Sequence, residues 1–103
     1  MKKVILSADG PMAVYLVPDQ VAENLEEYCG EFCGWMWKNP DGRRTLLKKW
    51  YDGTWYARYD ERDFIRYLNE WLFPEQPSRL VEQLGSCLEE PPEEYRNLPQ
   101  HNF

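Results

Sequence analysis

The spacing of apolar residues changes along the chain, and this change most limits what it can fold into. Residues 3–8 and 12–17 are short apolar runs of the β type, separated by a turn sequence at 9–11. Gly10 can adopt the positive φ that a tight turn requires, so the two runs predict a β-hairpin. Residues 19–37 instead repeat their apolar side chains at spacings of three and four, which predicts an amphipathic helix. This combination favours the α+β class.

The middle of the chain carries a second hairpin signal. Residues 45–51 and 54–59 flank an Asp-Gly pair at 52–53, and Asp-Gly between two such runs is a strong cue for a hairpin. We therefore favour two strands here, although residues 45–51 alone also fit a short helix. Just before them, the sequence Asn-Pro-Asp-Gly at 39–42 predicts a turn.

Two more helices are expected in the second half of the chain. Asp60 and Asp63 have the spacing of a capping box, and they begin a predicted helix over residues 61–73. A shorter helix is predicted over residues 78–85, because a serine suited to the N-cap starts this segment and a glycine ends it.

Together these elements predict an α+β fold with the order ββαββαα. We expect an antiparallel sheet of about four strands, built from the two hairpins, to pack in two layers against two main helices. The 103 residues match the usual size of one domain, and five Trp, seven Tyr and four Phe can fill its core. The predicted domain covers residues 1–88. Residues 89–103 are rich in Pro and Glu and are expected to form a mobile C-terminal tail.

Charge, cysteines and apolar segments indicate the cellular compartment and the kinds of partner to expect. The net charge of −6 disfavours nucleic acid and anionic membranes as partners, unless the basic residues are clustered. The apolar run at 4–8 is shorter than the roughly 7–15 residues of a secretion signal. No stretch approaches the roughly 18 apolar residues of a membrane span. Cys29 and Cys33, four apart on the predicted helix, are poorly placed for a disulfide. We therefore expect a cytoplasmic protein with free thiols.

Few residues offer reactive chemistry. His101 is the single histidine and lies in the expected tail, whereas a catalytic histidine must be held rigidly beside its partner. Cys29 and Cys33 fit two small thiols at the margin of a core. A zinc site would need a second ligand pair, for which only Cys87 and His101 are present. The sequence therefore predicts no enzyme, no catalytic residue, no metal site and no cofactor.

Basic residues are concentrated in one segment. Residues 38–58 hold six basic and two acidic residues, whereas the rest of the chain holds six basic and sixteen acidic residues. Aromatic residues are interleaved with these charges, a combination that suits an acidic protein partner or stacked bases. The candidate binding residues are Arg43, Arg44, Lys48, Lys49, Trp50, Tyr56 and Arg58. The other interpretation is structural, with the aromatic side chains on the core face of the hairpin and the charges on its outer face.

These observations favour a small non-catalytic interaction or regulatory module that contacts a protein partner through residues 43–58. An exposed aromatic face on this hairpin would also suit a homodimer. One alternative is a nucleic-acid-binding accessory protein that uses the same hairpin, although the net charge counts against it. Another is a small ligand-binding protein or enzyme with an aromatic pocket, lined by Trp35, Trp37, Trp50 or Trp55.

Overall fold

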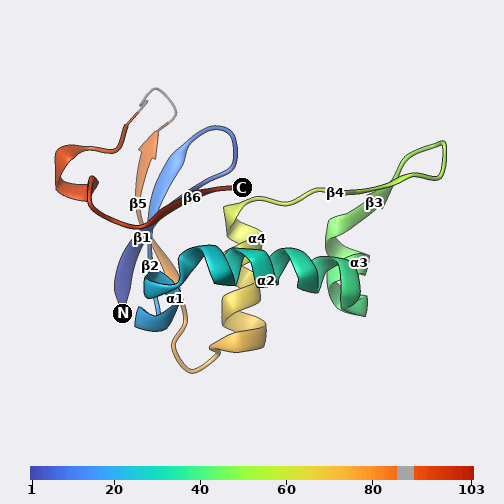
Figure 1. The fold of residues 1–103 in the computed structure, drawn as a ribbon, viewed down its shortest axis with the longest axis horizontal. Helices are drawn as coiled ribbons and strands as arrows, with labels where there is room; N and C mark the ends of the chain where they lie inside the picture. Colours follow the sequence, from blue (N-terminus) through green and yellow to red (C-terminus); the bar gives the residue numbers. More distant parts are fainter. Residues whose placement is uncertain (86–89) are drawn as a thin grey trace.

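The N-terminal hairpin forms as predicted. In the computed structural model, which describes residues 1–85 and 90–103, strands β1 (Lys2–Ser7) and β2 (Met12–Val17) pair antiparallel (Figure 1). Asp9, not Gly10, takes the positive φ in the turn, at 55°. Aspartate tolerates this left-handed conformation better than most residues do. The side-chain amide of Asn102 also fixes the turn, since it donates to Asp9 Oδ1 at 2.9 Å.

The main sheet is mixed, which corrects the prediction of an antiparallel sheet built from two hairpins. Its strand order is β5-β2-β1-β6. Strand β5 (Arg79–Gly85) pairs antiparallel with β2, and β6 (Gln100–Asn102) pairs parallel with β1. The second predicted hairpin forms a separate two-stranded sheet from β3 (Leu47–Lys49) and β4 (Trp55–Ala57). The α+β class is therefore confirmed, but the predicted order ββαββαα is wrong.

The predicted helix over residues 78–85 is strand β5. Ser78 does not cap a helix, because the side chain of Asn69 binds its backbone on both sides. The Ser78 N–H donates to Asn69 Oδ1 at 2.6 Å, and Asn69 Nδ2 donates to the Ser78 carbonyl at 3.0 Å. The segment then satisfies its backbone groups on the open edge of β2, so long-range pairing overrides the local helical pattern.

The predicted tail instead contributes to the fold. Strand β6 lies beside β1, where Ile5 N–H donates to the Pro99 carbonyl and Phe103 N–H donates to the Ser7 carbonyl, both at 2.9 Å. Upstream, the 3₁₀ turn η2 (Glu93–Tyr95) places Tyr95 over the sheet face opposite the helices. There the Tyr95 hydroxyl donates to Glu82 at 2.6 Å, and the ring lies 5.7 Å from Lys3 Nζ. Tyr95 thus contacts side chains of both β1 and β5 and ties the C-terminal segment to the sheet.

The long predicted helix is two helices, α1 (Asp19–Glu23) and α2 (Leu25–Lys38), separated at Asn24. The Asn24 side chain donates to the Gln20 carbonyl at 3.0 Å, which stabilises this break. The predicted apolar stripe is confirmed, since one face of α2 is buried through Leu25, Cys29, Phe32 and Met36. No helix among the described residues is both long enough and apolar enough to span a membrane.

The predicted capping box at Asp60 and Asp63 is confirmed and begins α4 (Glu61–Tyr67). The Asp63 carboxylate accepts the Asp60 N–H at 2.9 Å. The helix continues as the π-helical turn η1 (Leu68–Leu72), in which the Phe73 N–H donates to the Leu68 carbonyl at 2.7 Å. Helix α4 crosses α2 in Figure 1, and the two helices enclose the aromatic core.

The predicted turn at 39–42 is the start of helix α3 (Pro40–Leu46). Asn39 accepts the Asp41 N–H at 2.9 Å and Pro40 occupies the first turn, so these turn-forming residues act as a helix start. Gly42 allows α3 to approach α2 closely. A Cβ at this position would lie 2.9 Å from Met36 Cα and 3.0 Å from the Trp35 carbonyl oxygen.

Substitutions at two glycines are expected to have opposite effects on stability. Gly42→Ala should lower the free energy of unfolding by about 1–3 kcal/mol, because the new methyl group meets backbone atoms that cannot turn aside. Gly30→Ala should raise it by about 0.8–1.0 kcal/mol, since alanine favours the helix and nothing lies within 4 Å of the added Cβ. Urea denaturation of both variants checks the prediction, and equal effects at the two positions would contradict it.

Candidate interaction surface

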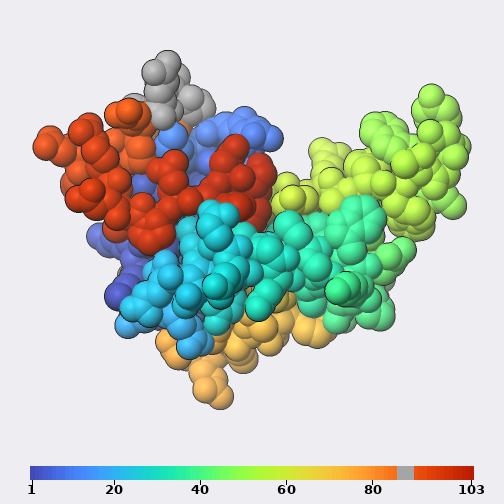
Figure 2. Space-filling model, viewed as in Figure 1, coloured from blue at the N-terminus to red at the C-terminus, as the bar shows by residue number. Residues whose placement is uncertain are grey.

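Strands β3 and β4 form an arm that projects from the body of the protein (Figures 1 and 2). The predicted Asp-Gly turn forms its tip. Gly53 has φ +91°, and its N–H donates to the Trp50 carbonyl at 3.0 Å. The Thr54 N–H donates to Asp52 Oδ1 at 2.9 Å, and this bond lowers the pKa of the Asp52 carboxyl. The two short strands therefore rest on a well-bonded turn.

The base of the arm is anchored in the core. Leu47 is buried at the start of β3, and Ala57 and Tyr59 pack against the main cluster of apolar side chains. The Arg58 N–H donates to the Leu46 carbonyl at 2.8 Å, which ties β4 to the end of α3. Since the base is fixed, the arm presents its tip at a defined position relative to the body.

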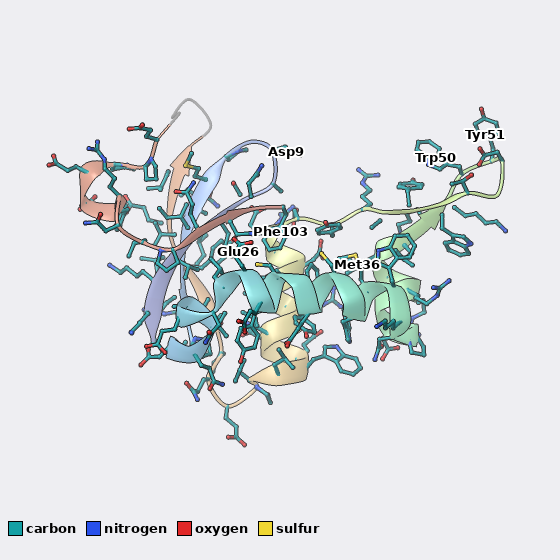
Figure 3. The ribbon with its side chains drawn as sticks, in the orientation of Figure 1. Asp9, Glu26, Met36, Trp50, Tyr51 and Phe103 are labelled. Atoms are coloured by element: carbon teal, nitrogen blue, oxygen red, sulfur yellow. The ribbon has the colours of Figure 1, made fainter. Side chains whose placement is uncertain are left out.

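Aromatic side chains at the tip are exposed. Trp50 retains 52% of its accessible surface, Trp55 retains 46%, and Tyr51 is fully exposed. Figure 3 shows Trp50 and Tyr51 at the outer end of the arm. The interpretation that the hairpin aromatics fill the core is therefore wrong for these three residues. The arm lies outside the four-stranded sheet, so the helices that cover that sheet do not cover its tip.

Two cations lie over Trp55 on one face of the arm. Arg43 Cζ is 5.6 Å from the ring centre and Lys49 Nζ is 5.7 Å from it, both within the range of a cation–π contact. Arg43 also donates to the Trp37 carbonyl at 2.8 Å, so its guanidinium is held in place. Trp37 itself is 42% exposed and extends the aromatic surface onto α2.

The opposite face of the arm combines aromatic rings with cations that have no partner. The rings of Trp50 and Tyr56 lie 4.5 Å apart between centroids. The register pairs Lys48 with Tyr56, so both lie on this face, and Arg58, the residue after β4, continues the same alternation. Among residues 1–85 and 90–103, no carboxylate lies within 4.0 Å of either cation. We call these residues together the arm surface, of which Tyr56 is half-buried and Arg43 comes from α3: Arg43, Lys48, Lys49, Trp50, Tyr51, Trp55, Tyr56 and Arg58.

The structure brings six of the seven sequence-predicted residues onto the arm or its base. Arg44 is the exception, because it pairs with Asp41 at 3.0 Å, whereas its neighbour Arg43 on α3 reaches the Trp55 ring. Tyr51, Trp55 and Trp37 are not among the candidate binding residues predicted for the hairpin, although the alternative of an aromatic pocket includes Trp37 and Trp55. The position of Tyr51 next to the Asp-Gly turn was a usable signal of exposure, since hairpin tips lie at the surface. Trp55 shares a strand face with Ala57, which packs at the base, so alternation alone suggested burial.

The reactive side chains lie elsewhere. His101 is held in β6, with its Nδ1 2.9 Å from Glu26 Oε1 and its ring edge-on to Phe103, which corrects the expectation of a solvated tail residue. Burial raises the pKa of the Cys29 thiol to about 12, so this cysteine is protonated at neutral pH. Cys33 is a second free, half-buried thiol, and Cys87 falls outside the described residues. Within the described ranges, no three His, Cys, Asp or Glu side chains are grouped as metal ligands.

No protein-family model, curated protein or solved structure matches this chain.

Proposed function

We propose that the protein is a non-catalytic interaction module that binds an acidic protein surface through the arm surface. The observation that carries this proposal is the exposure of Trp50, Tyr51 and Trp55 beside cations that pair with no carboxylate of residues 1–85 and 90–103. Trp, Tyr and Arg are the residues that most often dominate the energy of protein interfaces. Leaving them on a projecting arm is costly in solubility unless a partner covers them.

Charge defines the kind of partner. The segment that contains the arm is basic, whereas the rest of the chain carries sixteen acidic residues against six basic ones. An acidic partner is therefore repelled by the acidic body of this protein and attracted by its basic arm. The two proteins should therefore meet at the arm. The attraction acts over about 8 Å at physiological salt, so the partner must come close to the arm to be held by its charges.

A pull-down with a matched charge control tests the proposal. The double variant Lys48→Glu/Arg58→Glu reverses two cations of the arm that have no ion pair among the described residues. We expect it to lose the partner that the native protein retains from its own host, because like charges then face each other. The control variant Arg79→Glu/Arg96→Glu changes the net charge equally at exposed positions on β5 and beyond η2, and it should retain the partner.

Two outcomes would overturn the proposal. One is retention of the same partner by the arm variant. The other is loss of the partner from both variants, which would indicate an effect of net charge alone.

Nucleic acid is the competing partner, since exposed rings and cations can also stack on bases and bind phosphates. A fluorescence titration with a single-stranded oligonucleotide at about 50 mM salt separates the two, because phosphate binding is strongest at low salt. The proposal predicts no saturable binding. Saturable binding that Lys48→Glu/Arg58→Glu abolishes would replace the protein partner with a nucleic acid.

A further inference from the structure

A cavity lies on another part of the molecule, where α3 faces α4. It has a volume of about 320 Å³ and is lined by residues of α2, α3, α4 and η1, with none from β3 or β4. Pockets for small ligands begin at about 300 Å³. It is therefore large enough for a compact organic molecule.

Three aromatic rings form part of its wall. The ring of Trp35 lies 5.0 Å from that of Tyr67 and 5.4 Å from that of Trp71, measured between centroids. Trp71 remains 44% exposed, although it belongs to a helix that packs on the core. It lies within the π-helical turn η1, and such turns occur frequently at functional sites. The cavity thus offers an aromatic surface that the fold leaves uncovered.

The charges around these rings have an excess of one carboxylate. Arg44 is paired with Asp41 at 3.0 Å, and Arg66 is paired with Glu70 at 3.2 Å. The fifth charged residue of the wall, Asp63, accepts the backbone N–H of Asp60. Within the described part of the chain, no cation lies within ion-pair distance of Asp63. Both guanidinium groups are therefore ion-paired, whereas Asp63 has a backbone hydrogen bond but no ion pair among the described residues.

We infer that this cavity binds a small organic cation with an ammonium or guanidinium head group. An aromatic wall attracts a cation through the negative faces of its rings, and Trp is the most effective ring for this contact. The unpaired carboxylate of Asp63 supplies the opposite charge. An anion would meet three carboxylates and two arginines that already have partners, so the wall disfavours it. This site is independent of the proposed function of the arm.

Nuclear magnetic resonance titration with choline, and separately with agmatine, tests the inference. These probes carry a quaternary ammonium and a guanidinium head group respectively. We expect a saturable shift of the Trp35 indole N–H signal with at least one probe. The neutral isostere of choline, 3,3-dimethyl-1-butanol, should shift it far less. Trp71→Leu should weaken binding about twofold to thirtyfold, which corresponds to the usual range of a cation–π contact.

Two further variants keep the test independent of folding. Asp63→Asn removes the charge but keeps an oxygen for the Asp60 N–H, and it should also weaken binding of the cation. Trp50→Leu changes a tryptophan of similar exposure on the arm and should leave binding unchanged. The inference is overturned if neither cation gives a saturable shift, if the neutral isostere binds equally well, or if Trp50→Leu weakens binding as much as Trp71→Leu.

Discussion

Replacing Phe32 with alanine is expected to lower the free energy of unfolding by about 3–5 kcal/mol, the usual cost of removing a buried Phe ring. Phe32 is fully buried on α2, and its ring lies within 6.2 Å of five other aromatic rings. They come from α2, α4, the end of the arm and the C-terminal segment: Trp35, Tyr59, Phe64, Tyr67 and Phe103. The cavity left by alanine would therefore loosen every part of the core at once.

Urea denaturation measures this loss of stability, and two control variants test whether it comes from the buried position of the ring. Phe32→Leu should cost less, because leucine refills much of the space. Trp50→Ala removes an even larger ring at an exposed position and should change stability by no more than about 0.5 kcal/mol. A Phe32→Ala variant as stable as Trp50→Ala would show that the helices, sheet and arm base do not share one core.

The second large effect is expected at Phe103, whose replacement by alanine should cost about 2–3 kcal/mol, somewhat less than for a fully buried ring. Its ring lies 5.3 Å from Phe64 and 6.1 Å from both Phe32 and Tyr59. Figure 3 shows Phe103 directed towards α2. This ring holds β6 against the core, so its removal should also release the strand from β1.

Hydrogen exchange separates this local effect from a general loss of stability. In Phe103→Ala, the amide at position 103, which bonds to the Ser7 carbonyl, should exchange faster than the global change in stability explains. Amides that pair β1 with β2 should change only with global stability. Phe103→Leu should retain most of the protection. Uniform acceleration across the sheet would contradict a separate role of Phe103 in holding β6.

Local signals in the sequence predicted the elements that are stabilised by contacts between residues close together in the sequence. The hairpin of residues 3–8 and 12–17, the Asp-Gly pair and the Asp60–Asp63 capping box each depend on a few neighbouring residues, and each forms as expected. Residues 78–85 carry an equally good local helical pattern. They form a strand because Asn69 fixes the backbone of Ser78 and β2 offers an unpaired edge. Neither condition is visible in the segment itself.

The same holds for the candidate site: features set by neighbouring residues could be predicted, and features set by long-range strand pairing could not. The clustering of basic and aromatic residues on a hairpin could be predicted, because it depends only on sequence and strand alternation. The exposure of Trp50 and Trp55 could not, because it depends on which strands complete the main sheet. The segments expected to form a helix and a tail supply β5 and β6, so the arm remains outside that sheet.

Photo-cross-linking from the tip of the arm, in the native host, tests the central proposal most directly. With a photoreactive amino acid in place of Tyr51, the account predicts a discrete cross-linked product that protease digests and nuclease does not. Lys48→Glu/Arg58→Glu in the same chain should abolish it, and the same probe at exposed Gln76 should not give it. A product that survives this charge reversal, a product that nuclease digests, or no product from position 51 would contradict the account.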